Sequence, residues 1–192
     1  PFIMKQLLIS IILILITFSA IGNQDSTQAV WKEKYFEYSI IRNNIIAVPL
    51  FSIPPHKHPD MIYANVEFCN KDYSIRDWTE FTIQFIEQVL KKHLTIKEIK
   101  QLNNEDIQWA KARLHFEFSH SGEILYTWFS WKKDVNHIFT DEKLYAIYQD
   151  FMKMKIDTEG FLWWLKGKKP TTEEQKKIYG SISIPFFFHK WP

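Results

Sequence analysis

Two histidines and an aspartate gather in one short, proline-rich stretch of this chain. His56 and His58 are separated by one residue, and Asp60 follows two residues later. Imidazole nitrogens and a carboxylate oxygen are ligands that zinc accepts, so this spacing could begin a metal site. Further ligands would have to come from elsewhere in the chain, with His115, His120 and His137 as the candidates. We favour a surface loop with solvated histidines, and the alternative is a metal-dependent hydrolase.

The same spacing is similar to the start of the H-x-H-x-D-H motif of the metallo-β-lactamase family. The resemblance covers residues 56–60 and implies a zinc hydrolase. Met61 stands where that family has its next histidine, and the glycine-rich surroundings typical of the family are missing. The resemblance therefore supports the hydrolase only as the alternative.

Nucleophilic residues occur in contexts that local structure explains. A serine or cysteine nucleophile needs an adjacent base and a third group that orients the base. Ser119, His120 and Ser121 have suitable types, but they precede Gly122 at an expected hairpin tip, where small polar residues form the turn. Cys69 lies in an apolar stretch, which favours a buried, inert thiol over pairing with another molecule. We assign no catalytic residue.

The clearest strand signal is the alternation of apolar and polar side chains in residues 112–119. This period of two is typical of a strand with one buried face. A two-residue turn at Ser121-Gly122 predicts a second strand that continues to Trp131. Counting outward from the turn gives an apolar face with three opposite pairs: Phe118 with Leu125, Phe116 with Thr127, and Leu114 with Phe129.

The other face of this hairpin carries residue types that bind proteins. It is expected to present Arg113, His115, Glu117, Tyr126 and Trp128, with Glu117 opposite Tyr126 and His115 opposite Trp128. Tyrosine, tryptophan and arginine bury a large area in interfaces at modest entropic cost. We therefore predict a protein-binding face here, with another protein as the partner. The large number of aromatic residues favours the alternative, in which the C-terminal segment covers this face as a second core layer, and a partial cover would allow both. The covering aromatics would be Trp163, Trp164 and Phe186 to Phe188.

Residues 158–192 form an aromatic-rich C-terminal extension of the expected domain. Its tryptophans stand close to Lys166, Lys168 and Lys169, a combination that also occurs at lipid interfaces. The stretch from Gly160 to Gly167 is too short for a strong amphipathic helix. We therefore favour packing of this segment onto the domain.

Residues 1–22 have the features of a secretory signal peptide, with residues 1–3 upstream of the expected start. An apolar run covers residues 7–18, and the small residues Ala20 and Gly22 suit cleavage after residue 22. The run is shorter than the about 20 residues that a bilayer crossing needs, which favours cleavage over an uncleaved anchor. We expect an exported protein, periplasmic or extracellular, with no stable membrane insertion after cleavage.

Composition excludes several classes of protein. The 192 residues are 46% hydrophobic and 24% charged, which is typical of a globular domain. Five glycines argue against a nucleotide-binding fold, and a net charge of +2 gives no case for a nucleic-acid partner. One cysteine excludes an internal disulfide and a cysteine-cluster metal site. We expect no cofactor.

The remaining patterns predict one α+β domain over residues 23–192, a largely antiparallel sheet with helices packed on one face. Strands are expected at residues 35–41, 45–51, 61–68, 112–119, 123–131, 135–139 and 181–188. Helices are expected at residues 77–93 and after the caps Thr95, Thr140 or Asp141, and Thr171. This order is similar to that of small periplasmic domains of the PsbP type, a resemblance of fold that implies no activity.

Taken together, the sequence predicts an exported, non-enzymatic protein-binding protein, of which an immunity- or inhibitor-type protein is the concrete version. The secreted hydrolase, metal-dependent through His56, His58 and Asp60, is the alternative. The oligomeric state is not predicted.

Overall fold

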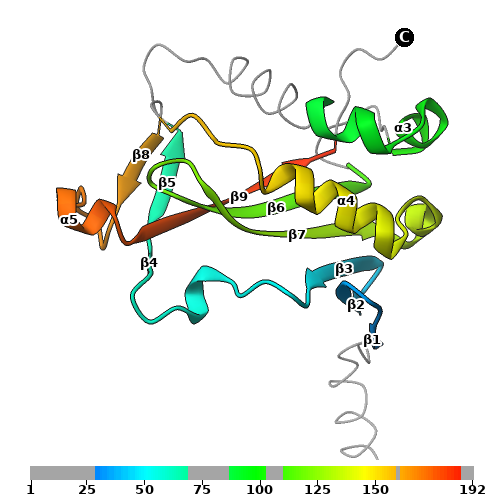
Figure 1. The fold of residues 1–192 in the computed structure, drawn as a ribbon, viewed down its shortest axis with the longest axis horizontal. Coiled ribbons are helices and arrows are strands. Elements are labelled where there is room, and N and C mark those ends of the chain that lie inside the picture. The colour runs from blue at the N-terminus through cyan, green and yellow to red at the C-terminus, as the bar shows by residue number, and fades with distance from the viewer. Residues whose placement is uncertain (1–28, 69–86, 103–109, 159–160, 187–192) are drawn as a thin grey trace, which may run out of the picture.

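The computed structural model describes residues 29–68, 87–102, 110–158 and 161–186. In these ranges a mostly antiparallel sheet and a few helices form one α+β body, which confirms the predicted class (Figure 1). A seven-stranded sheet has the order β1-β2-β3-β7-β6-β9-β4, and β5 pairs with β8 separately. The strands are β1 (Val30–Lys32), β2 (Phe36–Ile41), β3 (Asn44–Pro49), β4 (Ile62–Tyr63), β5 (Asn65–Phe68), β6 (Ala112–Ser119), β7 (Ile124–Lys132), β8 (Phe161–Trp164) and β9 (Ile178–Pro185).

The described helices are short. They are the α-helices α3 (Ile96–Leu102), α4 (Asp141–Phe151) and α5 (Thr172–Gln175) and the 3-10 helices η1 (Pro55–Lys57) and η3 (Lys133–Ile138). Residues 87–93 are also helical; the beginning of the helix predicted over residues 77–93 lies outside the described residues, as do residues 1–22 and Cys69. None of the helices in the described ranges has the length and apolarity that a bilayer crossing requires.

The predicted helix caps at threonine are present. Thr140 accepts a hydrogen bond from the backbone of Lys143 at the start of α4. Thr171 and Glu174 form a reciprocal capping box at α5. The helix α5 ends at Gln175, before the predicted end near Gly180, because β9 already begins at Ile178.

The central hairpin of β6 and β7 confirms most of the predicted register. Four predicted pairs are present: Leu114 with Phe129, Phe116 with Thr127, Glu117 with Tyr126, and His115 with Trp128. The predicted pair at the tip is wrong, because Phe118 lies opposite Ile124 rather than Leu125. Residues 120–123 connect the two strands, and Gly122 among them has φ 86°. The register shifts by one residue between Glu117 and Phe118, so the pairs from Glu117 onward, away from the turn, match the prediction. A Cβ on Gly122 would collide with the carbonyl oxygen of Ile156.

Two strand predictions are wrong. Residues 61–68 form two strands rather than one, because β4 pairs in parallel with β9 whereas β5 leaves that sheet for β8. β5 can pass close to β9 because Gly180 of β9 has no Cβ. A Cβ at this position would collide with the side chain of Val66 in β5. Residues 135–139 lie mainly in η3, where Val135 and Ile138 are buried at a spacing of three, which suits a 3-10 turn better than a strand.

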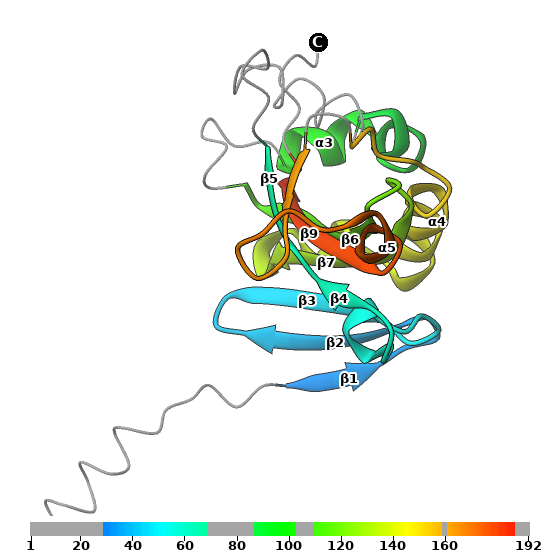
Figure 2. The ribbon, with the colours of Figure 1, turned by 90° about the vertical axis from the view of Figure 1, so that its left-hand side faces the viewer.

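The predicted hairpin of β2 and β3 is confirmed, with Ile41 opposite Asn44 around a turn in which Arg42 has φ 57°. The inner face of this hairpin packs on α4. Tyr35 stacks on Tyr145 at a centroid distance of 3.9 Å, and Phe36 meets Tyr148 edge to face. Figures 1 and 2 show α3 and η1 on opposite sides of β6 and β7.

The C-terminal aromatics join the core on the face that carries Phe118. Trp163 packs edge to face on Phe118 at 5.4 Å, and Phe186 lies against Phe139. Side chains alternate along β6, so Phe118 points away from the face of Glu117. The alternative in which these aromatics cover the face of Glu117 is therefore wrong for Trp163 and Phe186; residues 187–188 lie outside the described residues.

A buried carboxylate fastens the sheet to α4. Asp141 is 4% exposed. It accepts hydrogen bonds from the backbone N–H of Tyr35 at 2.8 Å, the backbone N–H of Phe36 at 3.2 Å and the hydroxyl of Tyr38 at 2.7 Å. Burial and the Asp141 charge raise the pKa of Tyr38 well above its usual range, so this phenol stays a donor. The first turn of α4 and the start of β2 are therefore held together by one side chain.

We predict that Asp141→Asn lowers the free energy of unfolding by about 3 kcal/mol, because the amide cannot accept three hydrogen bonds with the strength of a carboxylate. Glu142→Gln, one residue along and exposed, is the matched control and should change it by less than about 0.5 kcal/mol. Urea unfolding of the two variants measures both effects. Equal stabilities would contradict the anchoring role of Asp141.

Candidate functional site

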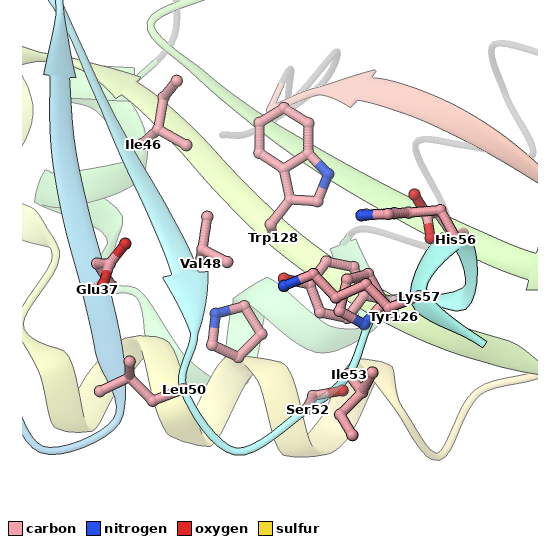
Figure 3. A pocket seen from close by; sticks show the side chains of 13 residues that line it. Glu37, Ile46, Val48, Leu50, Ser52, Ile53, His56, Lys57, Tyr126 and Trp128 are labelled. Carbon is pink, nitrogen blue, oxygen red and sulfur yellow. The ribbon is translucent and has the colours of Figure 1, made fainter. Parts of the chain in front are cut away.

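A hollow of about 630 Å³ opens where β3 parts from β7. The described pairing of these strands runs from Asn44 opposite Lys132 to Ala47 opposite Phe129, and β3 then diverges. Figure 3 shows Ile46 and Val48 of β3 on one side of this space and Trp128 and Tyr126 of β7 on the other. The lining residues are Glu37, Ile46, Val48, Pro49, Leu50, Ser52, Ile53, Pro54, His56, Lys57, Glu117, Tyr126 and Trp128.

Pro49 and the packing of Phe51 on α4 explain why the chain leaves β7 here. β3 ends at Pro49, which has no N–H to donate to a neighbouring strand. Phe51 then packs edge to face on Tyr145 and Tyr148 of α4, at 5.2 and 4.9 Å. The chain returns to the mouth of the hollow at η1, which brings His56 and Lys57 there.

Trp128 is held in a fixed orientation by its neighbour on β6. The ring of His115 stacks on it at a centroid distance of 3.6 Å and an interplanar angle of 3°. Nε2 of His115 also lies 2.8 Å from the hydroxyl of Ser130, which fixes the imidazole. Burial, aided by the charge of Arg113, lowers the pKa of His115 to about 4, so the imidazole is neutral at pH 7. A neutral, hydrogen-bonded ring therefore supports one face of the indole.

Glu117 places a carboxylate at the hollow without a complete set of partners. Its Oε2 atom is buried and accepts no hydrogen bond from any residue that the structure describes. Burial raises the pKa of Glu117, and the nearby charge of His56 opposes this effect. Tyr126, opposite Glu117 and 4% exposed, has a pKa raised by burial and by the Glu117 charge, so it stays protonated. An unsatisfied acceptor of this kind is destabilising unless a water molecule or a ligand supplies a donor.

The hollow unites residues from two separate sequence predictions. Glu117, Tyr126 and Trp128 of the predicted binding face line it, together with His56 of the predicted metal motif. The other two face residues lie beside it: His115 stacks on Trp128, and Nε of Arg113 donates to Ser183 on β9 at 3.0 Å.

The structure separates the residues of the metal motif. His58 and Asp60 line a second hollow of about 310 Å³ with Met61 and Leu125, whereas His56 lines the first. Within the described ranges, no group of three or more histidine, cysteine, aspartate or glutamate side chains is placed to hold a metal ion. The other candidate histidines have other neighbours: His120 lies against Trp163, and His137 bonds to Gln101.

Sequence reasoning missed the wall that residues 48–57 contribute. Leu50 and Ile53 are 45% and 60% exposed, an unusual environment for such large apolar side chains. The available signal was a run of apolar residues punctuated by Pro49, Pro54 and Pro55, which cannot continue a paired strand.

Comparisons with known proteins assign no family. No protein-family model and no curated protein matches the chain. Among solved structures, the chain is similar to a DUF5043 family protein from Bacteroides uniformis ATCC 8492, with a TM-score of 0.47 and 10% sequence identity. That similarity covers 88% of this chain and 90% of the other. A likeness at this level transfers no function.

The low pKa of His115 predicts a pH-dependent loss of stability. As the pH falls from 6.5 to 4, the unfolded chain binds a proton at this residue that the folded protein does not bind. We expect a loss of about 2–3 kcal/mol from this residue over that interval, and only about 0.4 kcal/mol above pH 6.5. Urea unfolding at pH 7 and pH 4 should show a correspondingly smaller loss in His115→Gln. An equal loss in both proteins would show that the imidazole titrates normally.

Proposed function

We propose that this protein is an exported, non-enzymatic binding protein that docks a partner protein in the hollow between β3 and β7, in an immunity- or inhibitor-type role. The observation that carries the proposal is the pair of aromatic side chains, Tyr126 and Trp128, in a concave site with an apolar rim. Protein interfaces concentrate their binding energy in such aromatic residues and in pockets that exclude water.

The composition of the rim supports a macromolecular partner. Val48, Leu50 and Ile53 line the hollow and are large apolar side chains with at least a third of their surface exposed. Exposed apolar side chains gathered around a concave surface are typical of interaction sites. Lys57 and Glu37 add charge at the edge of the same site, and a polar rim around an apolar centre is the usual anatomy of an interface.

The position of the site on the sheet is also favourable for docking. We infer that the α-helices pack on one face of the sheet and leave the face of Glu117 and Trp128, which the 3-10 helix η1 borders, accessible to a partner. The contacts of Phe36 and Tyr35 with α4, and of Phe118 with Trp163, all lie on the opposite face. Export rests on the signal peptide expected at residues 1–22, and the compartment is the periplasm or the cell exterior.

The alternative, a secreted hydrolase, has the support of one observation. His56 and Glu117, two groups that can transfer protons, line the same hollow. His58 and Asp60 face a different hollow, so a metal site made of all three motif residues requires a rearrangement of residues 56–60.

A photo-crosslinking amino acid placed at position 53 tests the proposed site in the cells that make the protein. Ile53 is 60% exposed at the rim, and Ile96 of α3, 55% exposed on another surface, is the matched control position. We expect a discrete crosslinked protein from position 53, none from position 96, and at least a tenfold lower yield when Trp128→Ala is added. Equal crosslinking from both positions, or none from position 53, would contradict docking in this hollow.

A further inference from the structure

We infer that the hollow receives a guanidinium group, supplied by an arginine side chain of the partner protein, which pairs with Glu117 and stacks on Trp128. This inference rests on the proposed function and specifies the chemistry of the partner. Three observations carry it: an unsatisfied carboxylate oxygen, an indole with one supported face, and an apolar wall for an aliphatic stem.

One carboxylate oxygen of Glu117 lacks a hydrogen-bond donor in the part of the chain that the structure describes. Oε2 of Glu117 is buried at the hollow and has no hydrogen-bond partner among the described residues. Its neighbour Tyr126 also lines the hollow but gives this oxygen no hydrogen bond. A cationic donor from a ligand would supply the missing bond and compensate the charge at once, and charge-assisted hydrogen bonds of this kind are stronger than neutral ones.

The indole favours a planar cation. His115 covers one face of Trp128 at a centroid distance of 3.6 Å. Trp128 itself lines the hollow together with Glu117. A guanidinium stacks on an aromatic face while its N–H groups donate in the ring plane, and it is more weakly hydrated than an ammonium. An arginine can therefore contact Trp128 and Glu117 together, which a lysine ammonium does less well.

The apolar residues that line the hollow can accommodate the aliphatic part of the partner's arginine side chain. Ile46, Val48 and Ile53 provide an apolar wall for a methylene stem. The second carboxylate of the lining, Glu37, is already paired with Lys32 at 2.9 Å. His56 and Lys57 are the lining residues of opposite character, and both are exposed on η1 at the mouth. The charge of Lys57 opposes a cation at the mouth, so Lys57→Gln should strengthen binding of the guanidinium group.

Two nearly isosteric probes, n-butylguanidinium and n-butylurea, test the inference because they differ mainly in charge. Each is titrated into the isotopically labelled protein, and the indole N–H signal of Trp128, assigned with Trp128→Phe, is followed by NMR. We expect a saturable shift with n-butylguanidinium and at least tenfold weaker binding of n-butylurea. Equal affinities for the two probes would overturn the inference.

Glu117→Gln is the decisive variant, because it keeps the shape of the side chain and removes its charge. We expect it to weaken n-butylguanidinium at least tenfold and to leave n-butylurea unchanged, whereas the exposed control Glu123→Gln should change neither. Removal of a poorly satisfied buried charge should leave the variant at least as stable as the wild type, so thermal unfolding excludes misfolding as the cause. Unchanged guanidinium binding in this variant would overturn the inference.

The crosslinking experiment separates this inference from the proposed function. If position 53 crosslinks a partner equally well in the wild type and in Glu117→Gln, the hollow is a docking site but the guanidinium pairing is wrong. If position 53 of the wild type captures nothing, the proposed function itself fails. A crosslink that Glu117→Gln weakens and Lys57→Gln strengthens supports both.

Discussion

The buried carboxylate of Asp141 is the contact on which the architecture of the site depends. It binds two backbone N–H groups and one hydroxyl of the segment that starts β2, and it stands in the first turn of α4. Because β3 is paired with β2 along its length, this contact also sets where β3 lies relative to the helix. Phe51 then packs on the same helix, so the chain is drawn away from β7 and the hollow opens between them.

The two faces of the central hairpin have opposite energetic roles. On one face, Leu114, Phe118 and Phe129 are fully buried, and burial of such side chains is the main source of stability. On the other face, Glu117 leaves a buried oxygen without a described partner, which costs stability. Proteins tolerate such groups chiefly at functional sites, where a ligand completes the hydrogen bonding. The first face also has one unpartnered buried group among the described residues, Nε1 of Trp163, but that group is a neutral donor. The unpartnered carboxylate oxygen of Glu117 is therefore the main physical reason to place function on the second face.

Local patterns in the sequence were sufficient for the elements and faces that local physics determines. Strict alternation in β6 fixed which side chains share a face, and the threonine caps marked the starts of α4 and α5. Residues 135–139 were misassigned because Val135 and Phe139 also fit an alternating pattern, and the burial of Ile138 is decided by tertiary packing.

The composition of the hollow could not be predicted, because it depends on contacts between distant segments. His56 meets the face of Glu117 only because residues 50–57 fold back across the open edge of β7. The separation of β4 from β5 at Ala64 likewise depends on Gly180, more than a hundred residues away in the chain, because the missing Cβ lets Val66 approach β9. The face residues Glu117, Tyr126 and Trp128 were identified from the sequence as one set, whereas the concavity that gives them a binding geometry was not.

Hydrogen–deuterium exchange of the full chain, with and without the partner captured through position 53, tests the central claim most directly. The account predicts that the partner slows backbone exchange in residues 50–57, next to Trp128, and leaves α3 unchanged. Protection confined to α3 and α4, with residues 50–57 exchanging as in the free protein, would contradict it.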